Sequence, residues 1–213
     1  MTHRSGNTRE TELIAATLEA IADEGIAGLT VRGIAERAGV TNGLIRFYFG
    51  GKDGLLRAAY RHFLDGLLET ADNALARRDL TAGERLAAFV DANLRAPIVA
   101  PETVLVWAHF LPLAHRDPEM ATIRDDAYSR TTGRLAPLIA AALAEAGRPC
   151  PEADIRRLAI SVNALIDGLW LEGALSPAPS AREPAGAPVR DLGLAAAGRL
   201  VGLSLQVPTE SAP

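Results

Sequence analysis

The sequence contains one cysteine, few aromatic residues and no long apolar run, and each shortage excludes a class of protein. The single cysteine, Cys150, excludes an internal disulfide framework and a cluster of cysteine metal ligands, and it fits a reducing compartment. No run of 18 apolar residues occurs and residues 1–9 are polar, so we expect neither a membrane span nor a secretion signal. We therefore expect a protein of the cytoplasm.

Proline is absent from the first part of the chain, since all 13 prolines lie at or beyond Pro97. With 213 residues, 48% of them hydrophobic and 23% charged, the chain is long enough to bury a core and is typical of a folded protein. Alanine and leucine are abundant and no stretch alternates with a period of two, so we predict an all-α fold. The uneven distribution of proline indicates two parts.

Capping residues and apolar spacing predict three helices at the N-terminus. The first covers about residues 8–24 and ends at Gly25, where a left-handed backbone is expected. Thr30 is the expected N-cap of a short second helix that Gly39 closes, and Thr41 is the expected N-cap of a third. Three short helices separated by single glycines are the predicted N-terminal domain.

The rest of the chain is predicted to form a helical bundle, which brings the total to about nine helices. A flexible connector rich in proline and small residues is expected over 176–188, and the last helix is expected to reach Gln206. The predicted domains are therefore 1–51 and 52–207. The six helices of the second domain are expected to begin near Lys52, Thr81, Pro101, Pro118, Pro151 and Val189.

The segment 30–49 has the pattern of a helix-turn-helix. Ala35 allows two helices to cross closely, Gly39 supplies the turn, and a second capped helix presents polar residues outward. Three apolar residues are expected to hold the two helices together: Ile34, Val40 and Ile45. The first turn of the second of these helices is expected to face a major groove with Thr41, Asn42 and Gly43.

The stretch from residue 29 to residue 56, which includes GLIRFYFGGKDGLL, resembles the N-terminal domain of TetR-family transcriptional regulators, and within that family the BetI-type branch. The matched region is about residues 13–63. The resemblance implies a DNA-binding domain followed by a helical domain that forms a homodimer and holds a small-molecule inducer. It implies a regulator, most often a repressor, that binds a palindromic double-stranded operator.

Carried over by position, the resemblance implies a set of DNA contacts that read bases or hold phosphates. The set is Thr30, Arg32, Thr41, Asn42, Gly43, Arg46, Tyr48 and Lys52. Arg46 departs from the family pattern, in which a tyrosine or a small polar residue is common, so the operator cannot be copied from a relative. Phe47 and Phe49 are expected to be core and domain-packing residues.

Several of these residues also have purely structural explanations. Helix capping alone would explain Thr30 and Thr41, and core packing would explain Tyr48. Arg46 and Lys52 would then be ordinary solvated charges. The sequence alone does not decide between these structural roles and DNA contacts.

The helix expected over about 152–175 carries two apolar stripes on nearly opposite sides, so it must bury two faces. The last helix repeats this pattern, and Gly198 and Gly202 are expected to permit close helix approach. These two helices are the predicted interface of a homodimer, with a large monomeric bundle as the alternative. The predicted interface residues are Ile160, Ala164, Leu171, Leu175, Leu194, Val201 and Leu205.

Aromatic and polar residues on the middle helices are the candidates for an effector pocket. They are Phe63, Phe89, Trp107, Phe110, Tyr128, Asn163, Asp167 and Trp170. Ordinary core packing would explain the tryptophans, and the polar residues would also suit an exposed or interface strip. Because the branch resembles a choline-responsive regulator, an aromatic cage around Trp107 or Trp170 with Asp167 as counter-charge is a further hypothesis.

Other functional classes have less support in the sequence. No Ser/His/Asp or Cys/His grouping, phosphate loop or Glu-x-x-His pair occurs at an interpretable spacing, so we expect neither an enzyme nor a cofactor. His109 and His115 do not share a helical face, which argues against a metal site. A DNA-binding protein without ligand control remains as an alternative, and the effect of small molecules on DNA affinity distinguishes the two.

Overall fold

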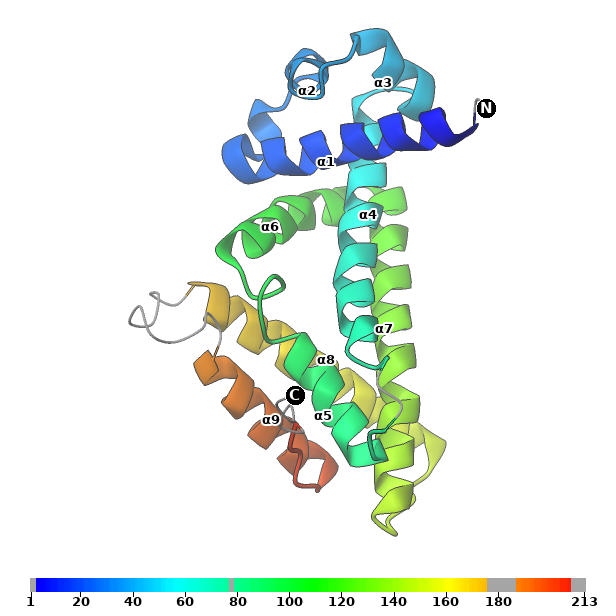
Figure 1. The fold of residues 1–213 in the computed structure, drawn as a ribbon, viewed down its shortest axis with the longest axis vertical. Coiled ribbons are helices and arrows are strands. Elements are labelled where there is room, and N and C mark those ends of the chain that lie inside the picture. The colour runs from blue at the N-terminus through cyan, green and yellow to red at the C-terminus, as the bar shows by residue number, and fades with distance from the viewer. Residues whose placement is uncertain (1–2, 77–78, 176–186, 208–213) are drawn as a thin grey trace. The chain divides into compact units, whose positions relative to one another are not determined.

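The computed structural model describes residues 3–76, 79–175 and 187–207, and over these residues the chain is helical without strands (Figure 1). The all-α prediction is confirmed. The helices are α1 (His3–Gly28), α2 (Val31–Arg37), α3 (Asn42–Phe49), α4 (Lys52–Asn73), α5 (Ala82–Ala92), α6 (Pro101–Arg116), α7 (Pro118–Glu145), α8 (Glu152–Leu175) and α9 (Ala187–Val201). Most of the predicted flexible connector, residues 176–186, lies outside the described residues.

The chain divides into two compact units. Unit 1 comprises Met1–Gly66 and Leu105–Asp126, and unit 2 comprises Leu67–Val104 and Ala127–Pro213. Helices α4, α6 and α7 each contribute residues to both units. Unit 1 thus contains the three N-terminal helices together with parts of α4, α6 and α7, and the functional boundary at residue 51 stays a prediction.

The N-terminal helices begin and end where local rules place them. Gly25 breaks the regular geometry of α1 with a φ of 69°, and Thr30 caps α2 by accepting a hydrogen bond from the Gly33 amide at 3.0 Å. Gly50 ends α3 in the left-handed conformation with a φ of 73°. These glycines and the Thr30 cap are confirmed.

Local rules also set the starts of α5, α6 and α7. Thr81 and Glu84 form a capping box at α5, in which each side chain bonds the other residue's backbone amide. Helix α6 begins at Pro101, and the Asp117 carboxylate caps α7 by accepting from the amide of Glu119 at 2.8 Å. The sequence therefore locates these helix starts correctly.

Helix α9 ends earlier than predicted, at Val201 and not at Gln206. Gly202 adopts a φ of 70°, and the Leu203 amide bonds back to the carbonyl of Gly198 at 2.8 Å. A Cβ on Gly198 would lie 2.6 Å from the Leu203 carbonyl oxygen. Gly198 and Gly202 therefore permit the reversal of the chain after α9. Their predicted role was a different one, a close approach between two helices.

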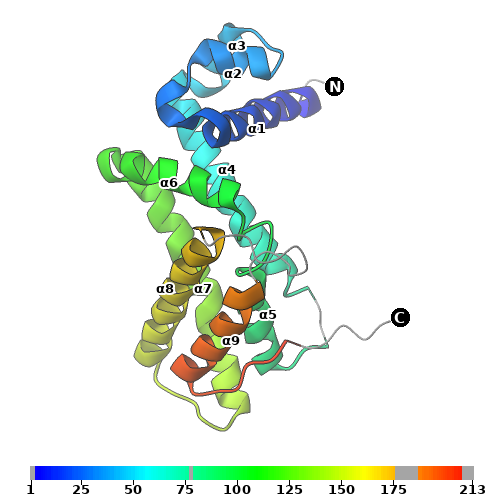
Figure 2. The same ribbon diagram turned by 90° about the vertical axis from the view of Figure 1, so that its left-hand side faces the viewer.

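Unit 2 contains α5, α8 and α9 together with most of α7 and parts of α4 and α6, and α8 lies beside α9 in both views (Figure 2). Residues 86–92 of α5 are all buried. The buried Asp91 carboxylate binds the guanidinium of Arg190 from α9 at 2.6 Å and also that of Arg95. Where α9 passes the end of α5, a Cβ on Gly193 would lie 2.1 Å from a methyl carbon of the buried Leu94, so a larger residue there would displace that side chain.

Candidate nucleic-acid interface

Helices α2 and α3 pack as a helix-turn-helix. Their contact buries Ile34, Ala35 and Ile45, each with at most 2% of its surface exposed. Gly39 makes the turn with a φ of 64°, and the amide of Val40 bonds the carbonyl of Ala35 at 2.9 Å. This anchoring fixes which face of α3 points outward.

Four of the eight predicted DNA contacts, Thr41, Asn42, Gly43 and Arg46, are exposed at the N-cap of α3 or along it, and the others lie at α2, at Tyr48 and at the start of α4. Tyr48 and Lys52 are half-buried, whereas the other six are exposed: Thr30, Arg32, Thr41, Asn42, Gly43 and Arg46. Asn42 and Arg46 share one side of α3 one turn apart, because they lie four positions apart in the helix, and Ile45 takes the buried side. The geometry suits a recognition helix with two hydrogen-bonding side chains in line.

The two candidate threonines differ in what their hydroxyl groups do. The Thr30 hydroxyl accepts a hydrogen bond from the Gly33 amide, so capping of α2 accounts for this residue. Thr41 occupies the N-cap position of α3 but makes no side-chain capping hydrogen bond. Capping therefore does not account for the Thr41 hydroxyl, which stands at the exposed start of α3.

The basic residues also differ in their partners. In the described part of the chain the exposed Arg46 has no ion pair, and Arg32 lies 3.6 Å from Glu36 with both side chains mostly exposed. The Lys52 ammonium donates to the carbonyl oxygen of Leu29 at 2.5 Å. Lys52 therefore joins the start of α4 to the chain before α2, a structural role that the sequence analysis missed.

Phe47 differs from its predicted place. Its side chain is 80% exposed, whereas Phe49 is half-buried. The prediction that Phe47 is a core residue is wrong, because two positions along a helix turn the side chain by about 200° away from the buried Ile45. An exposed phenylalanine thus lies beside Arg46 on the outward face of α3.

Two contacts within unit 1 join α4 to the end of α3 and α6 to α1. A Cβ on Gly54 of α4 would lie 1.9 Å from the carbonyl oxygen of Phe49, so the start of α4 passes against the end of α3. A Cβ on Gly25 would lie 2.8 Å from the ring of His109 on α6. Neither contact is visible in the sequence, because each depends on residues whose spatial approach is set by the fold.

An ion-pair cluster in unit 1 joins α4 to the start of α7. Arg57 binds the carboxylate of Asp117 at 2.7 Å and that of Glu119 at 3.0 Å. The hydrogen bond that Arg57 donates to Asp117 lowers the pKa of the Asp117 carboxyl and raises the pKa of the Arg57 guanidinium. The pair stays charged at neutral pH and holds the α6–α7 junction against α4.

The predicted effector residues are divided between the two units. Five belong to unit 2, and three of these form a hydrogen-bonded group: the Tyr128 hydroxyl donates to Asp167 at 2.9 Å, and the Asn163 amide donates to the same oxygen at 3.2 Å. The Trp170 indole N–H donates to the carbonyl of Ile98 at 2.5 Å. Phe89, the fifth, is fully buried in α5.

The other three predicted effector residues, Phe63, Trp107 and Phe110, belong to unit 1. Phe110 is fully buried and stacks on Tyr60 with ring centroids 4.5 Å apart. Among the described residues the buried Tyr60 hydroxyl has no hydrogen-bond partner, and burial raises its pKa. Sequence reasoning missed Tyr60, because a tyrosine on an apolar helix face is normally read as core packing.

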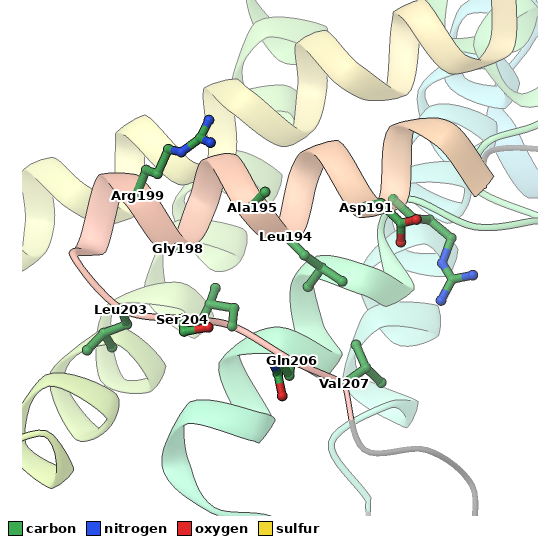
Figure 3. Close-up of a pocket in the computed structure, with 11 residues that line it drawn as sticks. Asp191, Leu194, Ala195, Gly198, Arg199, Leu203, Ser204, Gln206 and Val207 are labelled. Atoms are coloured by element: carbon green, nitrogen blue, oxygen red, sulfur yellow. The ribbon is translucent and has the colours of Figure 1, made fainter.

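Two open grooves lie on unit 2, away from the eight predicted effector residues. One, of about 660 Å³, runs between α9 and residues 203–207; Leu194 points toward the extended segment and Arg199 to the other side of α9 (Figure 3). The other, of about 560 Å³, lies near the ends of α7, α8 and α9 and includes Cys150. In the described residues no cluster of three or more His, Cys, Asp or Glu side chains could hold a metal ion.

Helix α8 buries one of the two apolar stripes that its sequence predicts, and the other stays largely exposed in this chain's described residues. The inner stripe is buried or half-buried, while Ile160, Ala164 and Leu175 of the predicted interface are exposed and Leu171 is half-buried. Among the described helices, only α8 is long and apolar enough to cross a membrane. One such helix is weak evidence for a membrane span, because a core helix of a folded protein meets the same criteria. Among the described residues, the outer face of α8 therefore exposes the apolar Ile160, Ala164 and Leu175 beside charged residues such as Arg157 and Glu172.

Helix α9 differs from the prediction in which stripe is exposed. Val201 and Leu205 are buried within unit 2 and Leu194 is half-buried, whereas Leu192 and Leu200 are 53% and 45% exposed. The reversal at Gly202 carries Leu205 off the helix and against the unit's own core. The outward apolar residues of α9 are thus Leu192 and Leu200.

Comparison with known protein families matches both parts of the chain. The profile of bacterial regulatory proteins of the tetR family matches residues 13–59. The profile of the BetI-type transcriptional repressor C-terminal domain matches residues 82–192. Together the two matches include the helix-turn-helix and most of the helices that follow it.

Individual proteins agree with these profiles. The chain is 36% identical over 173 residues to an HTH-type transcriptional regulator BetI of Burkholderia cenocepacia, covering 80% of this chain and 84% of that protein. A regulator of the same name from Paraburkholderia phytofirmans is 34% identical over 171 residues, with the same coverage.

Solved structures share the fold. A transcriptional regulator from Pseudomonas aeruginosa PAO1 superposes with a TM-score of 0.77 at 28% identity, covering 92% of this chain and 89% of that one. A regulator from Saccharomonospora viridis, solved in complex with choline, superposes with a TM-score of 0.70 at 22% identity, covering 88% and 94%. With its helix-turn-helix and its BetI-type C-terminal domain, this chain belongs to the TetR family of bacterial transcriptional regulators.

Proposed function

We propose that this regulator binds a palindromic double-stranded DNA operator as a homodimer in the cytoplasm and is released from it by a small-molecule effector. The observation that carries the proposal is the outward face of α3, where Thr41, Asn42 and Arg46 stand exposed on a helix anchored by the buried Ile45. Amide and guanidinium groups recognise adenine and guanine in the major groove by paired hydrogen bonds. The proposal includes no catalytic role.

The homodimer is supported by the outward apolar side chains of α8 and α9. Ile160, Leu175, Leu192 and Leu200 are each at least 45% exposed, and Ala164 leaves room for a close helix contact. Exposed leucine and isoleucine on two paired helices favour burial against the same surface of a second chain. Two recognition helices about 34 Å apart would then read a palindrome.

The effector site is proposed around the carboxylate of Asp167, to which Tyr128 and Asn163 both donate hydrogen bonds. A carboxylate next to a tyrosine suits a cationic ligand, and the neighbour from Saccharomonospora viridis was solved with choline. Quaternary ammonium compounds are therefore the first class to test. Trp170 would contribute ring surface only, because its N–H donates to Ile98.

Release requires that the effector bind the conformation with low DNA affinity more tightly than the DNA-bound one. A 100-fold difference in affinity corresponds to about 2.7 kcal/mol of coupling. Gly54 brings α4 against the end of α3, His109 of α6 lies against Gly25 of α1, and Arg57 joins α4 to the start of α7, so a shift of α4 would move α3. These contacts are the proposed route of the response.

Substitutions on α3 test the DNA-binding face. Asn42→Ala and Arg46→Ala should each weaken operator binding by about 1–3 kcal/mol while leaving random DNA little changed. Lys52→Ala should weaken both DNAs alike and lower the melting temperature, because it also removes the bond to Leu29. Fluorescence anisotropy over a salt series measures this, and Arg61→Ala on the exposed side of α4 is the control. Equal losses on both DNAs for all variants would contradict base reading.

Asp167→Asn tests the effector site. In the wild-type protein choline should lower operator affinity, and in the variant that response should fall at least tenfold in sensitivity, since the amide carries no charge to balance the ammonium. Operator affinity without ligand should be unchanged. Asp65→Asn, on the half-exposed side of α4, is the charge-matched control. An unchanged choline response in Asp167→Asn would exclude this carboxylate from the effector site.

A further inference from the structure

Phe47 is the most exposed large apolar residue of the described chain, with 80% of its surface accessible. It lies on α3, whose other apolar side chains are buried or half-buried. Burial of a phenylalanine ring is favourable, so an exposed ring on this helix is available to a partner that contacts α3. The partner must be one that reaches the outward face of α3.

The ring of Phe47 is held in a defined position. It meets the ring of Tyr48 edge to face, with centroids 5.1 Å apart and an interplanar angle of 79°, and Tyr48 in turn lies 6.2 Å from the ring of Phe49. A side chain supported in this way loses little conformational freedom when it binds. Binding through the Phe47 ring therefore costs little conformational entropy.

The neighbours of Phe47 indicate what it meets. Gly43 lies one turn before it and has nothing but the Thr41 hydroxyl within 4 Å of its Cβ position, so the surface beside the ring is bare backbone. The parallel column of the helix carries Asn42 and Arg46, which donate hydrogen bonds. An apolar ring beside an exposed glycine and two hydrogen-bond donors fits the major groove of DNA. On the base edges exposed there, the thymine methyl is the one apolar group.

We infer that Phe47 packs against the C5-methyl group of a thymine in each operator half-site and so selects thymine at that position. The inference rests on the proposed DNA-binding function. Burying one methyl group is worth about a threefold to fivefold gain in affinity. The operator therefore carries in each half-site a thymine that Asn42 and Arg46 do not specify.

The test replaces thymines of a selected operator by deoxyuridine, one position at a time, which removes only the methyl group. The wild-type dimer should bind one position per half-site about threefold to fivefold more weakly with deoxyuridine than with thymine. In Phe47→Ala the operator affinity should fall, and thymine and deoxyuridine at that position should bind alike. Phe47→Leu, which keeps apolar bulk, should retain part of the discrimination.

The outcomes separate this inference from the function on which it rests. If no thymine shows an effect in the wild type, or if Phe47→Ala keeps the same thymine preference, the inference is overturned while operator binding stands. If Phe47→Ala instead changes the oligomeric state, the ring covers a protein contact and the inference is also overturned. If no operator can be selected, the proposed function fails first. Because Phe47 is 80% exposed, the variants are expected to fold, and their melting temperatures verify it.

Discussion

Ala164→Glu is expected to convert the protein to monomers and to reduce operator affinity by at least 100-fold. Ala164 is exposed midway along α8, one turn after Ile160 and one turn before Gly168. In the proposed dimer this position is covered by the partner, so each protomer would bury an unpaired carboxylate. A monomer engages one half-site only and loses the 10²-fold to 10⁴-fold gain that linked binding provides.

Analytical ultracentrifugation measures the oligomeric state, and anisotropy with the full operator measures the loss of affinity. Ala141→Glu places the same charge on an exposed position of α7 and should leave a dimer with unchanged operator affinity. A dimeric Ala164→Glu protein with wild-type affinity would show that the outer face of α8 is not the interface.

Gly54→Ala is expected to displace the recognition helix. The new Cβ would lie 1.9 Å from the carbonyl oxygen of Phe49 and 3.0 Å from its carbonyl carbon. These are backbone atoms at the end of α3, so no side-chain rotation relieves the clash and the junction of α3 and α4 must move. We expect a loss of about 2–3 kcal/mol in unfolding free energy and at least a tenfold loss of operator affinity in the folded fraction.

Gly66→Ala is the matched control, because Gly66 lies in the same helix with nothing within 4 Å of its Cβ position. Alanine is the better helix former there, so this variant should gain about 0.5–1 kcal/mol. Urea denaturation measures both variants. If Gly54→Ala is stabilised to the same extent as Gly66→Ala, the close approach of α4 to Phe49 is contradicted.

The features predictable from the sequence are those that local chemistry decides. Gly25, Gly39 and Gly50 adopt the expected left-handed backbone, and Thr30 caps α2 as expected. The helix-turn-helix follows from these signals, because capping, turn and apolar spacing agree over 20 consecutive residues of the segment 30–49. The same agreement explains why the family is recognisable from this segment.

The features that escaped prediction depend on which of two faces turns inward. A short helix such as α3 offers several ways to pack, and the sequence alone did not show that Phe47 faces outward. In α9 two apolar stripes are present, and the reversal at Gly202 buries Val201 and Leu205 within unit 2. Burial is decided by the whole unit, whereas periodicity describes a single helix.

The contacts of the candidate effector site were only partly predictable. The sequence indicates Tyr128, Asn163 and Asp167 only as separate polar residues on the middle helices. In the structure, Tyr128 and Asn163 both donate hydrogen bonds to the Asp167 carboxylate. The hydrogen bond from the Trp170 indole N–H to the Ile98 carbonyl could not be predicted from the sequence, since the two residues lie 72 positions apart. Long-range hydrogen bonds of this kind require the fold.

The most direct test of a dimeric, sequence-reading regulator is the selection of duplexes from a random library by the full-length protein. The selection should be made at about 0.15 M salt, because non-specific binding depends on salt and hides specificity at lower concentrations. We predict enrichment of an inverted repeat whose half-site centres lie about 10 base pairs, or a multiple of this spacing, apart. Recovery of unenriched sequences by ligand-free protein would contradict the account.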